Sequence, residues 1–180
     1  MLFMLRLMLL RHAKSSWTDP GADDMDRPLT PRGRRAAQAM GRVMAAKRLL
    51  PDLVLCSPAR RARDTWKLAA EELKTAPKLI VEDSIYDFGN GGRLIDAVRR
   101  AGGKARTVLV VGHNPSMERI AARLAGKDSG KLRERLEKKY PTGALAVIAF
   151  NLADWQGLNG GEGELEHFIR PKDIMGDAAD

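Results

Sequence analysis

Short apolar runs, each ending in polar residues, recur along the chain. The clearest is Thr107–Gly112, which is almost entirely apolar, as expected for a parallel strand that is buried on both faces. A second run, Leu5–Leu10, ends at Arg11 and His12 and also predicts a buried strand. Further strands are predicted at Asp52–Cys56, Lys78–Val81, Ala144–Asn151 and Glu164–Ile169. Together these runs predict a sheet.

Amphipathic stretches separate the predicted strands. Three of them start with a capping residue followed by proline, namely Thr30-Pro31, Ser57-Pro58 and Asn114-Pro115, which is typical of helix N-termini. Helices are therefore predicted over residues 32–50, 57–74 and 93–101 and from residue 115 onward. Strands that alternate with helices predict an α/β fold, a three-layer α/β/α sandwich with a mostly parallel central sheet.

The remaining segments are polar. Thr18–Pro31 is rich in Asp, Pro and Gly and predicts a loop. Residues 127–140 are highly charged, which predicts an exposed helix or a mobile insertion. No linker or internal repeat is evident. Residues 1–170 are therefore expected to form a single domain, and residues 171–180 a disordered tail.

Polar residues that could take part in catalysis or binding follow three of the strands. His12 comes after the first strand, residues 57–61 after the second, and His113 after the Thr107 strand. Ligands of open α/β sheets bind at the carboxyl ends of the strands, and helix N-termini there favour anions. Each piece alone is a weak signal, because a histidine at a strand end is more often structural and Ser57 could be only a cap. Together they predict an anion site at one sheet edge.

Charge and composition restrict the classes of binding partner that are expected. The 180-residue chain has a formal net charge of +8, which suits acidic proteins, phosphorylated ligands or nucleic acid, although a merely solvated basic surface is an equal alternative. Aromatic residues are scarce, and no Lys/Arg tract is interleaved with them. Nucleic acid is therefore not expected as a partner.

Other features speak against metals, membranes and disulfides. The apolar N-terminus is interrupted by Arg6 and is shorter than the roughly 20 residues of a membrane span, so no membrane association is expected. Cys56 is the single cysteine, which fits a reducing cytoplasm and a place in the core. Three histidines, with His167 expected at the surface, lack the close spacing of zinc ligands. Neither a metal nor a cofactor is expected.

Four motifs, in this order, resemble the histidine phosphatase superfamily, and within it the SixA-like phosphohistidine phosphatases. They are Leu10–Trp17 (LRHAKSSW), Asp26–Gly33 (DRPLTPRG), Ser57–Thr65 (SPARRARDT) and Val111–Pro115 (VGHNP). The resemblance covers residues 5–150 and implies a phosphoglycerate mutase-like fold. It also implies a phosphatase that works through a covalent phosphohistidine.

The resemblance implies roles for particular residues. His12 would be the nucleophile, Arg11 and Arg61 would bind the phosphoryl oxygens, and a cationic His113 would add positive charge. Arg60 and Arg63 would then lie at the surface.

The roles of the remaining candidates are less sharply defined. Asp87 takes the place of the carboxylate that protonates the leaving group in many superfamily members, with Glu82 and Asp83 as rivals and an ordinary loop aspartate as the alternative. Lys14 is expected at the rim. Ser15 matches a substrate-contacting serine of sugar-phosphate mutases. Trp17 is expected to pack rather than to stack on substrate.

The expected activity is metal-independent dephosphorylation of protein phosphohistidine in the cytoplasm. The chain lacks the long insertions that form lids over small substrates in larger relatives, so an open pocket is expected. One alternative is a phosphatase or mutase acting on small phosphorylated metabolites. The other is a non-catalytic fold that binds phosphorylated partners or nucleic acid. The presence of all four expected pocket residues argues against this alternative, namely Arg11, His12, Arg61 and His113.

Overall fold

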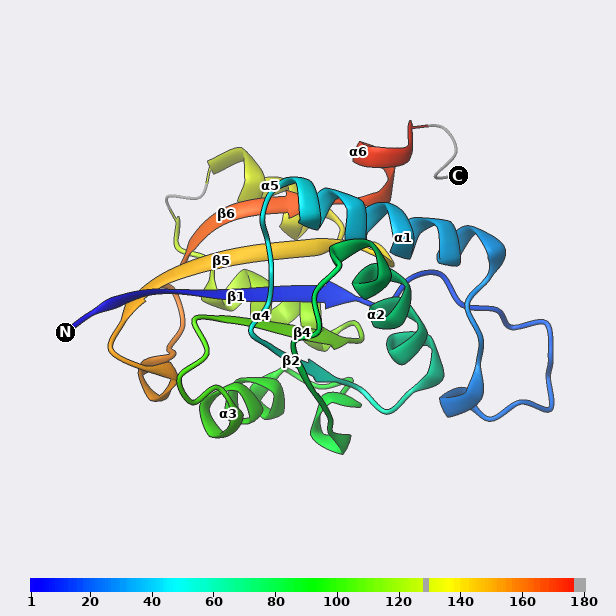
Figure 1. Cartoon of the computed structure of the whole chain (residues 1–180), viewed down its shortest axis with the longest axis horizontal. Coiled ribbons are helices and arrows are strands. Elements are labelled where there is room, and N and C mark those ends of the chain that lie inside the picture. The colour runs from blue at the N-terminus through cyan, green and yellow to red at the C-terminus, as the bar shows by residue number, and fades with distance from the viewer. Residues whose placement is uncertain (128–129, 177–180) are drawn as a thin grey trace.

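Residues 1–127 and 130–176, which the computed structural model describes, contain one six-stranded sheet in the order β3-β2-β4-β1-β5-β6 (Figure 1). The strands are β1 (Phe3–Arg11), β2 (Leu53–Cys56), β3 (Lys78–Val81), β4 (Thr107–Gly112), β5 (Leu145–Leu152) and β6 (Glu164–Ile169). β1, β2, β3 and β4 pair in parallel, whereas β5 runs antiparallel to both of its neighbours. The predicted mostly parallel sheet is confirmed.

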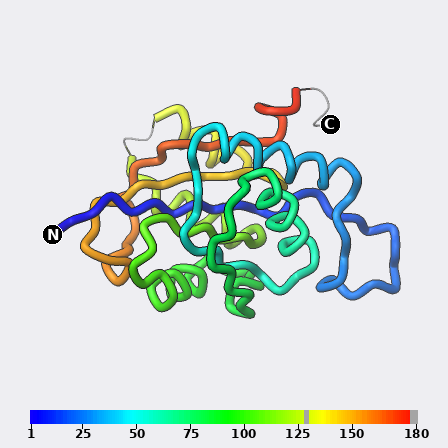
Figure 2. Tube along the Cα trace, in the orientation of Figure 1, coloured from blue at the N-terminus to red at the C-terminus, as the bar shows by residue number. Residues whose placement is uncertain are grey.

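Helices cover both faces of the sheet (Figures 1 and 2). They are α1 (Pro31–Ala46), α2 (Arg60–Leu73), α3 (Gly92–Ala101), α4 (Ser116–Leu124), α5 (Gly130–Lys138) and α6 (Pro171–Met175). One core joins α1, α2 and α6 to one face, and a second core joins α3, α4 and α5 to the other. Along β1, Leu7 and Leu9 enter the second core, and Met8 and Leu10 enter the first. The predicted three-layer α/β/α sandwich is confirmed.

The start of α1 lies directly against the segment that follows His12. Thr30 caps the helix by accepting from the Gly33 N–H at 3.0 Å, and its own hydroxyl donates to the Lys14 carbonyl at 3.2 Å. A Cβ at Gly33 would lie 2.1 Å from that carbonyl oxygen, so only glycine permits this approach. The predicted cap at Thr30 is confirmed, although α1 ends at Ala46 instead of Leu50.

Two other predicted caps are wrong. α2 begins at Arg60 and α4 at Ser116, each without a side-chain cap. Ser57 instead hydrogen-bonds His113 at 2.7 Å, and Asn114 donates to the Tyr140 carbonyl at 3.0 Å. These polar side chains therefore hold the strand-end loops together. Ser57 Oγ also accepts from the Ala59 N–H at 3.2 Å, and Asn114 donates to the Glu118 carboxylate at 3.1 Å, but neither caps a helix N–H.

The chain end also differs from expectation. A disordered tail is predicted from residue 171, but Pro171–Met175 forms α6, and Ile174 packs against the core. Residues 177–180 lie outside the described part of the chain. In the charged segment 127–140, the structure places α5, which buries Leu136 and leaves most other side chains exposed or partly exposed, while residues 128–129 lie outside the description.

Three smaller expectations can also be compared with the structure. Cys56 is buried, as predicted, and burial raises the pKa of its thiol to about 12. His167 on β6 is half-buried, not fully at the surface. Among the described helices, none has the length and apolar character needed to cross a membrane.

Candidate active site

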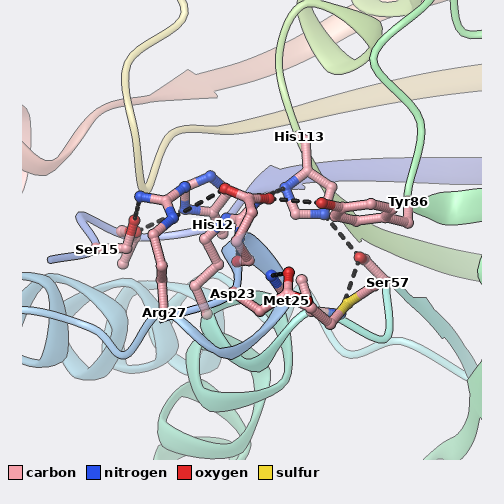
Figure 3. Close-up of polar contacts among 12 residues, drawn as sticks. His12, Ser15, Asp23, Met25, Arg27, Ser57, Tyr86 and His113 are labelled. Carbon is pink, nitrogen blue, oxygen red and sulfur yellow. Dashed lines mark hydrogen bonds and ion pairs between the residues drawn. The ribbon is translucent and has the colours of Figure 1, made fainter. Parts of the chain in front are cut away.

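The carboxyl ends of the central strands bring four distant side chains to one cavity of about 950 Å³. Arg11 ends β1 and His12 follows it, Arg61 lies in the first turn of α2, and His113 follows β4. The ring centroids of His12 and His113 are 5.2 Å apart (Figure 3). All four residues line the cavity, at the sheet edge that the sequence predicts.

His12 is held as a neutral imidazole. Its Nδ1 lies 2.7 Å from the Ala13 carbonyl oxygen, and because a carbonyl only accepts, Nδ1 carries the proton and Nε2 the lone pair. Burial, together with the nearby charges of Arg61 and Arg11, lowers the pKa of His12 to about 3, although the hydrogen bond to Ala13 acts in the opposite direction. At neutral pH the ring can therefore act as a nucleophile through Nε2.

Arg11 and Arg61 present unused hydrogen-bond donors. Arg61 is only 1% exposed, and its two terminal nitrogens donate to Asp24, one to the main-chain carbonyl at 2.6 Å and one to the carboxylate at 3.0 Å. Arg11 donates from one terminal nitrogen to the Tyr140 carbonyl at 2.8 Å. The Nε atoms of both arginines are buried and lack a partner among the described residues. Both arginines line the cavity, and two guanidinium charges held there favour an anion.

His113 is neutral in this state, contrary to the expected cation. Its Nδ1 accepts from Arg61 at 3.3 Å and its Nε2 donates to Ser57 Oγ at 2.7 Å (Figure 3). Burial, together with the neighbouring His12 and Arg61, lowers the pKa of His113 to about 3. A bound phosphoryl dianion would raise this pKa, because a nearby opposite charge favours the protonated ring.

A carboxylate that sequence reasoning did not single out lies in this site. Asp24 belongs to a short 3-10 helix, Asp24–Asp26, inside the predicted loop. One carboxylate oxygen accepts from Arg61 at 3.0 Å and from the Tyr86 hydroxyl at 2.5 Å, and the other accepts from Arg27 at 2.9 Å. Although burial pushes its pKa up, the hydrogen bonds from Tyr86 and Arg61 lower the pKa of Asp24 to about 2. Asp24 lies in an aspartate-rich stretch, where nothing in the sequence distinguishes it from its neighbours.

Asp87 lies deeper in the fold than its predicted role suggests. Its side chain accepts from Ser116 Oγ at 2.7 Å and from the Gly89 N–H at 3.3 Å. Asp24 and not Asp87 is among the described residues that line the cavity. The rivals Glu82 and Asp83 do not line it either, and Glu82 pairs with Arg100.

The rim residues are placed as follows. Lys14 and Ser15 line the cavity, and the Ser15 hydroxyl accepts from Arg27 at 2.9 Å. Trp17 also lines it and is 74% exposed, so the expectation that it packs in the fold is wrong. The Arg27 guanidinium lies 3.5 Å from the centroid of the Trp17 ring. Trp17 lies in irregular chain between the Ser15–Leu29 bridge and the turn at residues 20–21.

Of the three arginines at the start of α2, one is buried and lines the cavity. Arg61 is buried, whereas Arg60 and Arg63 are exposed, and Arg60 pairs with Asp64 at 3.5 Å. No group of three or more His, Cys, Asp or Glu side chains in residues 1–127 and 130–176 is placed to hold a metal ion.

The two depressed histidine pKa values predict acid sensitivity of the fold. The unfolded chain binds more protons than the native state between a pH of about 3, the folded pKa of both rings, and about 6.5. Stability therefore falls as the pH decreases through this window. Urea unfolding is expected to give a smaller free energy of unfolding near pH 5 than near pH 7.

The matched control is a double variant, His12→Asn with His113→Asn, which removes both rings and keeps the half-buried His167. Its loss of stability over the same pH interval should be much smaller. An equal loss in both proteins would assign the acid sensitivity to groups outside the cavity.

Comparison with known proteins agrees with this fold and site. Residues 7–92 match the histidine phosphatase superfamily (branch 1). An uncharacterised protein of Mycobacterium tuberculosis is 39% identical over 142 residues, which cover 77% of this chain and 85% of the relative. The chain belongs to the histidine phosphatase superfamily and is a phosphatase of that superfamily.

Two similar solved structures are assigned as the phosphohistidine phosphatase SixA. The one from Nakamurella multipartitia has a TM-score of 0.81 and 28% identity, and the similarity covers 94% of this chain and 97% of that chain. The one from Agrobacterium tumefaciens has a TM-score of 0.77 and 31% identity, with 94% and 99% covered. The SixA-like, phosphoglycerate mutase-like fold predicted from the sequence is confirmed.

Proposed function

We propose that this phosphatase hydrolyses phosphohistidine on proteins through a covalent phosphohistidine on His12. The observation that carries the proposal is the cavity that brings the neutral His12 together with the guanidinium groups of Arg11 and Arg61. Guanidinium groups suit phosphoryl oxygens because their donors lie in one plane and match two oxygens at once.

The proposed reaction has two steps. In the first, the Nε2 lone pair of His12 attacks phosphorus and a P–N bond to His12 forms. The bond to the substrate imidazole breaks, and its electron pair goes to that ring, which already carries a proton on its other nitrogen and leaves as a neutral imidazole. In the second, water attacks phosphorus, the P–N bond breaks, and inorganic phosphate and His12 are released. Arg11 and Arg61 stabilise the charge on the equatorial oxygens in both steps, so the proposal requires no metal or cofactor.

The cavity supports a substrate presented by a protein. At about 950 Å³ it exceeds what a phosphoryl group needs. Phe88 lines it, is 46% exposed, and lies with its ring centroid 5.0 Å from that of His113. An imidazole that leaves the phosphoryl group could pack on this ring.

Turnover of a substrate panel tests the proposal. A phosphohistidine peptide is expected to give a higher kcat/KM than small phosphomonoesters. The opposite order would favour the alternative, a phosphatase or mutase for phosphorylated metabolites. Binding of phosphate analogues without any turnover would favour a non-catalytic module.

A variant of Asp87 is expected to distinguish phosphohistidine from phosphomonoester substrates. Asp24 is ionised and paired with Arg61, so it is poorly suited to donate a proton. Asp87, which is held by Ser116 in this structure, is proposed as the general acid in a substrate-bound state in which its side chain turns toward the leaving group. An alkoxide needs a proton as it leaves, whereas an imidazole can already carry one. Asp87→Asn is therefore expected to slow hydrolysis of an alkyl phosphate by roughly 10²-fold and to leave phosphohistidine hydrolysis almost unchanged.

Steady-state kinetics with an alkyl phosphate, a phosphohistidine peptide and an aryl phosphate check this result, with Asp83→Asn as the matched control. If Asp87→Asn is harmless on all three, Asp87 is only a loop residue. Equal damage on all three would mean that it orients the pocket through Ser116.

A further inference from the structure

The cavity extends from His12 to a second end that the reaction does not use. This end is formed by the C-terminal end of α5, the turn before β5 and the start of α6 (Figure 1). Its lining residues are Lys138, Lys139, Pro141, Thr142, Pro171 and Lys172. The cavity therefore offers a place for parts of a substrate beyond the phosphoryl group.

The charges at this second end are unbalanced. Asp24 is the single carboxylate among the described residues that line the cavity, and it already pairs with Arg61 and Arg27. Lys138, Lys139 and Lys172 are exposed and form no ion pair within the described part of the chain. An anionic group bound here would meet ammonium groups that no carboxylate of residues 1–127 and 130–176 pairs with.

Hydrogen bonds connect the segment that carries two of the lysines to the segment that carries His12. The Gly143 N–H, in the turn after α5, donates to the main-chain carbonyls of Arg11 at 3.1 Å and His12 at 3.0 Å. Arg11 returns a side-chain hydrogen bond to the Tyr140 carbonyl at 2.8 Å. The segment that carries Lys138 and Lys139 is thus tied to the strand end that carries His12.

α6 is tied to the same unit. Asp173 accepts from Arg135 of α5 at 2.7 Å and pairs with Arg170 at 2.8 Å. This contact joins α5 to α6, and Lys172 lines the same cavity as Lys138 and Lys139. The two basic positions therefore lie on connected elements and can act on one bound segment.

We propose that Lys138, Lys139 and Lys172 form a subsite for acidic side chains that flank the phosphorylated histidine of a protein substrate. This inference rests on the proposed function, and it specifies that the protein substrate is acidic around its phosphohistidine. Carboxylates fit better than a second phosphate group, because the three proposed cations are flexible ammonium groups. The guanidinium group of Arg170, which also lines the cavity, is already engaged by Asp173. The lysines would act on encounter and orientation, and not on the chemical step.

Two phosphohistidine peptides of equal length test the subsite, one with glutamates and the other with glutamines beside the phosphohistidine. The wild type is expected to prefer the glutamate peptide in kcat/KM by about tenfold at low salt, and less as screening increases. In the variant Lys138→Gln/Lys139→Gln/Lys172→Gln the ratio is expected to fall to about one.

The matched control is Lys67→Gln/Lys78→Gln/Lys104→Gln, which removes three exposed lysines that do not line the cavity. It carries the same change in net charge and should keep the wild-type preference. Thermal unfolding of both variants checks that each is folded.

The outcomes are distinct. Equal rates for both peptides in the wild type, or a preference that survives in the first variant, would overturn the subsite while leaving the proposed function intact. Inhibition of the wild type by tripolyphosphate tests whether the lysines bind a small polyanion instead. If the first variant loses this inhibition but keeps the peptide preference, the subsite for acidic side chains is overturned in favour of a small polyanion. A wild type that hydrolyses phosphomonoesters but neither peptide would refute the proposed function, and the subsite for acidic protein segments with it.

Discussion

Replacement of His12 by alanine is expected to lower turnover on the order of 10⁴-fold or more, as removal of a covalent nucleophile typically does. The variant should fold, because His12 lies at a strand end, and the ring's hydrogen bond goes to the adjacent Ala13 carbonyl at 2.7 Å. Loss of a buried neutral ring removes no charge. Rapid-quench mass spectrometry of the wild type should find an acid-labile phosphate on His12.

The control for this variant is His167→Ala. His167 is half-buried on β6 and does not line the cavity, so its loss should leave turnover near the wild-type level. A His12→Ala enzyme with near-normal turnover, or a trapped phosphate on another residue, would rule out the covalent mechanism proposed here.

Arg61→Ala is expected to produce the second large effect. Removal of a buried charge-assisted donor should cost on the order of 1.5–3 kcal/mol or more in transition-state binding, measured as a fall in kcat/KM. The loss also leaves the Asp24 carboxylate without the partner at 3.0 Å, which adds negative charge next to the incoming phosphoryl group. Affinity for vanadate or tungstate should fall in parallel.

The neighbouring Arg60 is the natural control. It is exposed and pairs only with Asp64 one turn later, so Arg60→Ala should leave kcat/KM almost unchanged. Arg61→Lys is expected to recover little activity, because an ammonium group cannot replace the planar guanidinium that contacts Asp24 and His113 together. If Arg60→Ala were the more damaging change, the assignment of the phosphate-binding arginine would be wrong.

The same arginine explains how the resting site balances its charges. Asp24 occupies the two terminal nitrogens of Arg61 and leaves its Nε unpaired. The carboxylate thereby offsets part of the positive charge of a site that contains Arg11, Arg27 and Arg61. Burial and these cations keep both histidines neutral, which preserves the lone pair that His12 needs for attack.

Local pattern was sufficient for the strands, the sandwich architecture and the edge where the site lies. The apolar runs that become β1 and β4 are buried on both faces, and this requirement is visible in their composition. Since parallel strands end at the same edge, the residues after them had to converge. The order of strands and motifs along the chain is therefore enough to place Arg11, His12, Arg61 and His113 together.

Contacts between distant segments decided the rest. Asp24 reaches Arg61 and Tyr86 from an irregular loop, and no periodicity marks a loop residue for such a role. The charge state of His113 depends on burial and on the cations around it, which no local pattern encodes. Ser57 and Asn114 looked like helix caps, because a side chain that can cap a helix can equally bond a distant group, and only the packed chain determines which partner is nearer.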